Sequence, residues 1–297
     1  MTSTEALRET LHRIEQAEVL DTPGRALQAV SSRLTRSDAV KNALSGTWLG
    51  HRLHPMLTDV PIGAWVGAAV LDLVGGRRSG TAARRLVGLG ILAALPTAAS
   101  GLADWEDTHG GDQRVATVHA GANSVGLVLQ VLSWRARGKG HGVRGRALSM
   151  AALGAVTAGG YLGGHLVFNL RVGVDAEQRL LSPGSWHDAI AVNELVDDAP
   201  HGLTIDGAPV VVVKHGDALC ALSAICTHAG GPLAQGAVAD GAIRCPWHGS
   251  EFSLDDGSVR RGPATTPECV YQTRVQDGMV QVRARTEAEL AVDLTVV

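Results

Sequence analysis

The chain has 297 residues and a formal net charge of −3, so it is long enough for two domains and lacks the basic excess of a nucleic-acid-binding protein. Four cysteines in a chain of this length argue against a disulfide-stapled scaffold. The distribution of polar and apolar residues predicts three parts: a polar helical segment at 1–50, an apolar region at 51–175, and short alternating runs at 186–286.

The first fifty residues are polar and dotted with arginine. Residues 4–18 carry Leu7, Leu11 and Ile14 at helical spacing, which predicts a solvent-facing amphipathic helix. A second helix is expected from about Gly24 to Leu44. No apolar stretch typical of a cleavable export signal occupies the start of the chain.

Four apolar runs follow in series, each with almost no charge inside. They cover approximately Val60–Val74, Leu86–Ala103, Val115–Leu132 and Leu148–Val172. A helix needs roughly 17 to 25 such residues to cross about 30 Å of hydrocarbon, a length that the first run reaches only if it starts near Met56. We therefore predict a four-helix α-helical transmembrane bundle in a lipid membrane. A soluble bundle of unusually apolar helices is the alternative.

Tryptophan and glycine positions fit a membrane setting. Trp48 and Trp105 lie near the run ends expected on one side and Trp134 on the other, as in an aromatic belt. The segment TAGGYLGGHL, residues 157–166, contains two pairs of glycines four residues apart, a spacing that lets helices approach closely in lipid.

Loop charges predict a multi-pass protein of the cell membrane but leave its orientation open. The loops after the first and third runs carry nine basic residues, whereas the opposite side has only Lys41, Arg52, Arg114 and Arg171 nearby. By the positive-inside rule, both termini would lie outside the cytoplasm. The missing export signal points the other way, so the side that the last domain faces stays open.

The pattern becomes strand-like after the turn-forming residues at 182–184. Six short runs separated by turn signals are expected as strands: His187–Val192, Gly202–Ile205, Pro209–Lys214, Leu219–Leu222, Cys269–Val275 and Met279–Val282. A small antiparallel all-β domain is therefore predicted to follow the bundle.

Two motifs in this domain each combine one cysteine with one histidine. CTHAGGPL begins at Cys226 and contains His228, and CPWHGSEF begins at Cys245 and contains His248. Zinc is the metal that two cysteines and two histidines bind most commonly, but its usual motifs pair Cys with Cys and His with His. Mixed pairs suit two irons bridged by sulfides, because each loop can give its thiolate to one iron and its imidazole to the other.

At these positions the chain closely resembles the Rieske iron–sulfur family, and the resemblance extends over about residues 187–286. It implies a [2Fe-2S] cluster in which Cys226 and Cys245 hold one iron, while His228 and His248 hold the other. The remaining cysteines of the chain lie in apolar strand-like runs and are interpreted as buried structural residues.

The same resemblance bears on the reduction potential. High-potential members have one further cysteine in each loop, joined as a disulfide, where this chain has Gly231 and Trp247. Ser250 matches a hydroxyl that donates towards the cluster, whereas Phe252 replaces a tyrosine. Because fewer donors stabilise the reduced state less, we predict a potential in the lower half of about −150 to +300 mV. Gly262-Pro263 resembles the proline loop that covers the cluster.

Residues 50–63 and 163–175 resemble a family of uncharacterised bacterial four-helix membrane proteins, which implies no particular activity. In an up-down bundle, His54, His119 and His165 would fall at the same side of the membrane, on which the β domain also lies. His119 is expected about four residues inside its helix, roughly 6 Å deep.

These three histidines are candidate cofactor-binding residues, because ionisable groups inside a membrane usually face the bundle interior. Imidazoles from facing helices are a common way to hold haem b. A quinone pocket, with Asp104 as a proton acceptor, is a second interpretation. A hydrogen-bond network that merely fixes helix packing is the third.

The patterns together favour a membrane-bound Rieske protein that carries single electrons between a membrane donor, quinol or haem, and a redox partner. Whether the chain is itself an enzyme stays open, because such a cluster relays electrons without binding substrate. A redox sensor or structural cluster module is one alternative, and an electron-transfer component of an oxygenase system is another. A complete oxygenase needs a further domain with a 2-His-1-carboxylate iron site, and only eleven residues follow Thr286.

Overall fold

A computed structural model describes residues 3–75, 79–174, 181–182 and 184–286. These residues fall into two units. The first lies within 1–40 and 52–173, and the second lies within 41–51 and 174–297.

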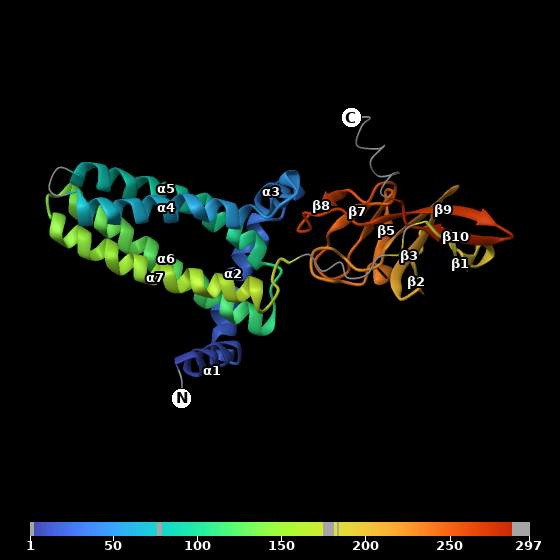
Figure 1. Ribbon diagram of the computed structural model, residues 1–297, viewed down its shortest axis with the longest axis horizontal. Coiled ribbons are helices and arrows are strands. Elements are labelled where there is room, and N and C mark those ends of the chain that lie inside the picture. The colour runs from blue at the N-terminus through green and yellow to red at the C-terminus, as the bar shows by residue number, and fades with distance from the viewer. Residues whose placement is uncertain (1–2, 76–78, 175–180, 183, 287–297) are drawn as a thin grey trace. The chain divides into compact units, whose positions relative to one another are not determined.

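The first unit is built around four long helices that lie side by side (Figure 1). They are α4 (Leu53–Val74), α5 (Gly80–Trp105), α6 (Gly110–Gly138) and α7 (Gly142–Phe168). All four are long and apolar enough to cross a membrane. The predicted bundle is therefore confirmed, although all four helices begin earlier than expected and α7 ends before Val172. His119 consequently lies nine residues, roughly 14 Å, beyond the start of α6 rather than four.

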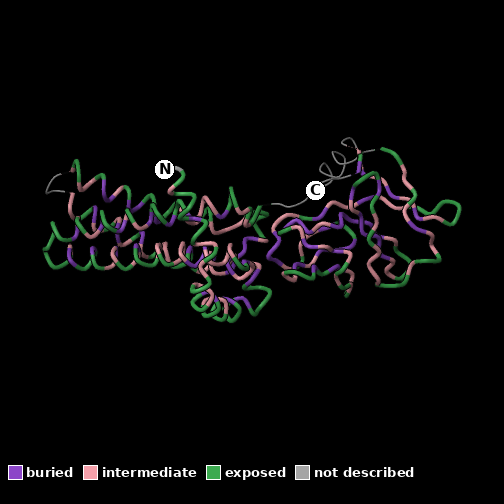
Figure 2. The backbone as a smooth tube through the Cα atoms, turned by 90° about the horizontal axis from the view of Figure 1, so that it is seen from below, coloured by how far each residue is buried: buried purple, intermediate pink, exposed green. Residues whose placement is uncertain are grey.

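Exposed positions run along the four helices (Figure 2), and many of them carry large apolar side chains. Valines and leucines that would be buried in a soluble bundle are about half exposed or more, among them Val66, Val70, Leu73, Leu92 and Val128. Such a continuous apolar surface is stable in lipid rather than in water.

Glycines set the contact between α6 and α7. A Cβ on Gly126 would come within 2.7 Å of Val156, and one on Gly159 within 2.6 Å of Asn123. Gly160, by contrast, has nothing within 4 Å of the Cβ position. Only one of the two glycine pairs in TAGGYLGGHL therefore packs inside the bundle.

The N-terminal residues form α1 (Ser3–Glu15), the short helix η1 (Glu18–Leu20), α2 (Asp21–Leu34) and α3 (Asp38–Ser45). The single helix expected from Gly24 to Leu44 is thus two helices. Leu11 of α1 is buried in a cluster with Trp105 and Val115, so the predicted amphipathic helix packs its apolar face on the bundle.

The second unit contains two antiparallel sheets. The larger has the order β1-β10-β9-β4-β3-β2, and the smaller has the order β5-β6-β7-β8. The strands of the larger sheet are β1 (His187–Ala191), β2 (His201–Ile205), β3 (Ala208–His215), β4 (Ala218–Ser223), β9 (Val270–Gln276) and β10 (Met279–Arg283). These six match the six predicted strands.

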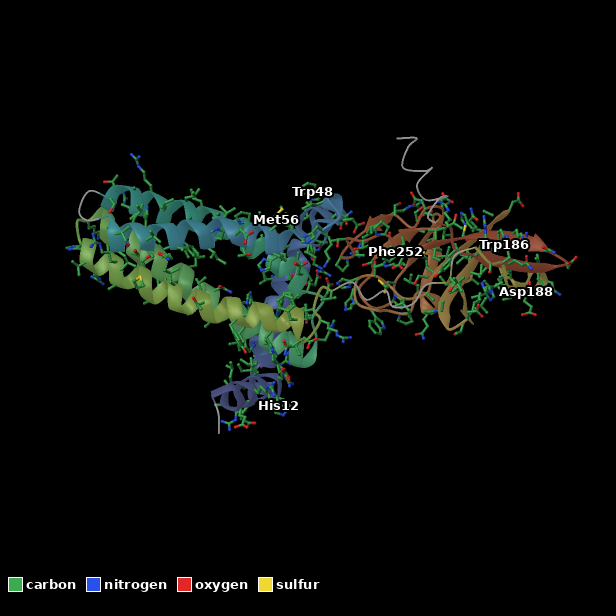
Figure 3. All side chains as sticks on the ribbon, in the orientation of Figure 1. His12, Trp48, Met56, Trp186, Asp188 and Phe252 are labelled. Carbon is green, nitrogen blue, oxygen red and sulfur yellow. The ribbon has the colours of Figure 1, made fainter. Side chains whose placement is uncertain are left out.

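The smaller sheet, two of whose strands flank the second Cys/His motif, was not predicted from the sequence. Its strands are β5 (Ala237–Ala239), β6 (Ala242–Arg244), β7 (Glu251–Ser253) and β8 (Val259–Arg261). Strands of three residues are too short to show the alternation by which strands are recognised. Phe252 of β7 is fully buried in the core of this domain (Figure 3).

Candidate metal centre

Two loops of the β domain are closed in the same way. The first, residues 226–231, follows β4, and the second, residues 245–250, follows β6. In each loop the cysteine N–H donates to the carbonyl five residues later, at 2.8 Å, and the N–H four residues later donates back to the cysteine carbonyl. That fourth position is Gly230 or Gly249, with φ of 78° and 72°, a conformation that favours glycine.

The four predicted ligands form a sulfur pair and a nitrogen pair. Cys226 and Cys245 are almost fully buried, and their thiols hydrogen-bond each other. The ring centroids of His228 and His248 lie 4.9 Å apart, with the ring planes at 84°. Two thiolates on one iron and two imidazoles on another require this pairing.

Backbone donors stabilise negative charge on the sulfurs. The N–H of His228 points at Cys226, and the N–H groups of Trp247 and His248 point at Cys245. The hydrogen bond from Cys226 and these backbone donors lower the pKa of Cys245 to about 6, while the same thiol pair and burial raise the pKa of Cys226. These donors therefore favour the thiolate form of Cys245, which is the form that binds iron.

The donor arrangement fits a two-iron cluster better than a single ion. Within the described parts of the chain, no three His, Cys, Asp or Glu side chains are placed to hold one metal ion. A tetrahedral zinc site needs four ligands around one ion. A [2Fe-2S] cluster needs only two protein ligands for each iron, because the bridging sulfides supply the others.

The two imidazoles differ in exposure. His228 is 6% exposed, whereas His248 is half-buried and is followed in the loop by glycine. The neighbouring Trp247 is 57% exposed, and its ring lies 6.3 Å from that of His248. The exposed edge of the candidate ligand set is therefore formed by Trp247 and His248.

Gly231 and Trp247 occupy the two positions at which high-potential relatives have a disulfide, and here the two residues pack on each other. A Cβ on Gly231 would come within 2.6 Å of Cys245 Sγ and 3.3 Å of the Trp247 ring. Only glycine fits between them. The two loops are thus joined by van der Waals contact at this point.

Ser250 is oriented by the segment that follows β8. Its hydroxyl is fully buried and accepts the Ala264 N–H at 3.0 Å. A hydroxyl has one hydrogen to donate, and this contact does not use it. Ser250 can therefore donate its hydrogen towards a cluster, as the sequence predicts.

The proline loop, defined here as residues 262–267, connects both ligand loops. Besides the bond from Ala264 to Ser250, the Thr227 hydroxyl donates to the Thr266 carbonyl at 2.8 Å. Glu268, buried at 3% exposure, accepts the Thr227 N–H at 2.7 Å. This buried carboxylate was not identified in the sequence, because no spacing relates Glu268 to the first motif.

The membrane histidines do not all come together. The ring centroids of His54 and His119 lie 6.3 Å apart inside the bundle. His54 Nδ1 lies 2.9 Å from the carbonyl of Thr97, and His119 Nδ1 lies 2.7 Å from the carbonyl of Gly159. These two residues are the only pair of the three candidates whose rings are in contact among the described residues.

The other polar candidates in the bundle have separate partners. His165 Nε2 lies 3.1 Å from Glu15 Oε1 of α1. Asp104 accepts a hydrogen bond from Arg52 at 2.9 Å. Its carboxylate is thus engaged in a largely buried ion pair.

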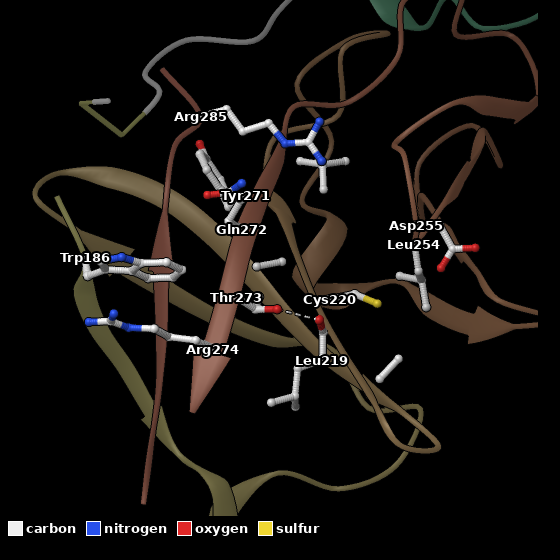
Figure 4. A pocket seen from close by; sticks show the side chains of 13 residues that line it. Trp186, Leu219, Cys220, Leu254, Asp255, Tyr271, Gln272, Thr273, Arg274 and Arg285 are labelled. Carbon is white, nitrogen blue, oxygen red and sulfur yellow. Dashed lines mark hydrogen bonds between the residues drawn. The ribbon is translucent and has the colours of Figure 1, made fainter. Parts of the chain in front are cut away.

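A pocket of about 540 Å³ lies elsewhere in the β domain, beside Cys220 and Trp186 (Figure 4). Arg274 stacks over the Trp186 ring at 4.3 Å, and Thr273 donates to the Leu219 carbonyl at 2.8 Å. Burial raises the pKa of Cys220, which keeps this thiol neutral. Cys220 is therefore an unreactive part of the wall, as expected from the sequence.

Comparison with known families divides the chain in the same way. Residues 185–282 match the model of the Rieske [2Fe-2S] domain, and residues 50–176 match a predicted membrane protein family, DUF2231.

Several known proteins are similar to the β domain. The anthranilate 1,2-dioxygenase ferredoxin subunit of Burkholderia cepacia is 34% identical, over 33% of this chain and 90% of its own length. The cytochrome b6-f complex iron-sulfur subunit of Chlorobaculum tepidum is 37% identical, over 31% of this chain and 54% of its own length. Among solved structures, the ferredoxin of carbazole 1,9a-dioxygenase from Nocardioides aromaticivorans IC177 is 26% identical, with a TM-score of 0.33, and covers 34% of this chain and 100% of its own.

Proposed function

The chain belongs to the Rieske [2Fe-2S] family and joins that domain to a DUF2231 membrane domain, and on this basis we propose that it carries single electrons between a donor in the membrane and a redox partner. The separation of the ligands into a buried sulfur pair and a nitrogen pair with one accessible imidazole is the observation that carries the proposal.

Each ligand has a distinct part in this function. When bound, the cluster supplies one-electron oxidation and reduction. Cys226 and Cys245 would hold the buried iron and receive the backbone N–H donors that stabilise added negative charge. His228 and His248 would hold the outer iron, and His248 would face the partner.

The membrane donor is proposed to bind at His54 and His119. Both Nδ1 atoms contact backbone carbonyls, which only accept hydrogen bonds, so each Nδ1 carries the proton and each Nε2 is an acceptor. The Nε2 of His119 also lies 3.3 Å from Asn123 Nδ2, a donor with which a quinol hydroxyl would have to share it. A quinol presents two hydroxyl donors to such acceptors. Haem b would use the same Nε2 lone pairs to bind its iron.

Packing around the two rings favours the quinol. A Cβ on Gly101 would lie 2.7 Å from the His54 ring, and one on Gly163 would lie 3.1 Å from the His119 ring. A macrocycle placed between the imidazoles would have to part these helices further than a single quinol ring does. His165, through its contact with Glu15, would support the bundle rather than bind the ligand.

The test uses the whole protein in detergent, with a short-chain quinol as the reductant. The proposal predicts that the quinol reduces the cluster and that His54→Leu or His119→Leu slows this reduction by about tenfold or more while leaving dithionite reduction unchanged. His12→Leu, an exposed histidine of α1, is the matched control. Haem bands in the purified protein would replace quinol by haem b as the occupant.

Onward transfer separates an electron carrier from a sensor or a structural cluster. A carrier passes its electron to a soluble one-electron acceptor protein, in repeated turnovers. An oxygenase component would do so only with an oxygenase as the acceptor. If neither the quinol reduces the cluster nor any acceptor reoxidises it, the carrier function is rejected.

A further inference from the structure

A segment that precedes the membrane helices packs within the β domain unit. Residues 41–51 lie in the second unit, although more than 120 residues separate them from the rest of it. Lys41 is only 3% exposed and Ser45 is fully buried, so side chains of this segment are enclosed by neighbouring residues. It comprises the end of α3 and the short helix η2 (Thr47–Leu49).

Asn42 pairs with the free edge of the smaller sheet. The strand β8 is the last in the sheet order and pairs with β7 through Val259 and Arg261. The carbonyl of Arg260 and the N–H of Gly262 therefore point away from β7. Asn42 Nδ2 donates to that carbonyl at 3.2 Å, and Asn42 Oδ1 accepts that N–H at 2.7 Å. One amide side chain thus satisfies an exposed sheet edge as a neighbouring strand would.

Thr47 binds the chain two residues beyond Gly262, at Ala264. Its hydroxyl donates to the Ala264 carbonyl at 3.1 Å. A Cβ on Gly262 would come within 2.7 Å of the Thr47 hydroxyl, so this approach needs a glycine. Asn42 and Thr47 therefore contact the chain between Arg260 and Ala264, where β8 leads into the proline loop.

The proline loop is in turn hydrogen-bonded to both ligand loops. The same Ala264 that accepts from Thr47 donates its N–H to Ser250, two residues after His248. Arg261 donates to the Gly249 carbonyl at 2.7 Å. Thr266 accepts from Thr227, which lies between the ligands of the first loop.

We infer that residues 41–51 are an integral part of the cluster domain, in which Asn42 and Thr47 are positioning residues that fix the proline loop and, through Ser250, tune the cluster. This inference rests on the proposed cluster, but the contact itself is measurable without it. It implies that the electronic properties of the cluster depend on the segment through which the chain enters the membrane bundle.

The contact is tested by amide hydrogen exchange on the full-length protein. Asn42→Leu keeps the size of the side chain and removes both hydrogen bonds. We expect exchange at the Gly262 amide to become about tenfold faster or more. Asn193→Leu, at an exposed position of the same domain, should leave that exchange unchanged.

The positioning role is tested by the EPR g-values and by the equilibrium constant for reduction by a fixed redox dye. Thr47→Val should change that constant by at least about threefold and shift the g-values, and Thr47→Ser, which keeps the hydroxyl, should restore both. The Thr47 pair decides the matter if Asn42→Leu does not fold.

Two results would overturn the inference. Unchanged exchange at Gly262 in Asn42→Leu would show that the segment does not hold the loop. If Asn42→Leu does not fold, unchanged g-values and an unchanged reduction constant in Thr47→Val would overturn the positioning role. Faster exchange with unchanged g-values and reduction would show that the segment packs without tuning. If the wild type lacks a cluster altogether, the proposed function fails, while the exchange result still decides whether the segment holds the loop.

Discussion

Gly231 lies directly against Cys245, and a Cβ on this glycine would come within 2.6 Å of the sulfur. The contact joins the tips of the two ligand loops without a covalent bond. The position of the ligand sulfur is therefore set by the absence of a side chain on the opposite loop.

Gly231→Ala should displace Cys245 and reduce bound iron and sulfide. Groups that orient a metal ligand typically change metal affinity about tenfold or more, and we expect a loss of that order. The measurement is iron and acid-labile sulfide per protein after purification. Gly154→Ala, with open space around its Cβ position, is the control. Full cluster content in Gly231→Ala would contradict the close contact.

Phe252→Tyr should raise the reduction potential. Phe252 is fully buried in the domain core, and a hydroxyl added there could donate to a ligand sulfur as in the high-potential relatives. We expect a rise of about 50 mV, close to a tenfold change for a one-electron couple. The chain's other phenylalanine, Phe168, is 84% exposed, and Phe168→Tyr should leave the potential unchanged. A wild-type reduction potential in the upper half of the family range would contradict the prediction that few hydrogen-bond donors stabilise the reduced cluster.

The pair of His215 and Asp198 should make stability depend on pH. Their hydrogen bond, at 2.6 Å, raises the pKa of His215 above its usual value. A raised pKa stabilises the fold below about pH 6.5, and this contribution is lost as pH rises through the folded pKa. Asp198→Asn should therefore lower the melting temperature of the β domain near pH 6 and have little effect near pH 9. An equal loss at both values would exclude this ion pair as the cause.

Asp72→Asn should destabilise the bundle. Asp72 and Arg137 are 5% and 4% exposed, and Arg137 Nη1 donates to Asp72 at 2.8 Å. Breaking a buried ion pair typically costs about 3 to 5 kcal/mol because one charge is left unpaired. Unfolding in mixed micelles measures this loss. The exposed pair of Arg13 and Glu9 offers the control, since Glu9→Gln should cost less than about 1 kcal/mol.

The candidate cluster ligands could be proposed from the sequence because their signal is local. The cysteine and histidine of each motif lie within three residues of each other, and the required thiolate and imidazole chemistry limits what such a pair can bind. The four membrane helices and six longer strands were predictable for a similar reason, since their periodicity or length extends over many residues.

What could not be predicted depends on contacts between distant residues. Asn42 is more than 200 positions from Gly262, and nothing in the sequence indicates that its amide completes a sheet edge. The association of His54 with His119, and of His165 with Glu15, is likewise set by helix packing. The short strands β5 to β8 gain their hydrogen bonds only when the whole sheet assembles.

The central claim is tested most directly by an EPR spectrum of the detergent-purified protein, recorded oxidised and after reduction with dithionite. The account predicts no signal before reduction and, afterwards, the rhombic signal of a [2Fe-2S] cluster with mixed cysteine and histidine ligands, lost in His248→Ala. A protein that contains zinc in place of iron, or a signal that survives in His248→Ala, would contradict it.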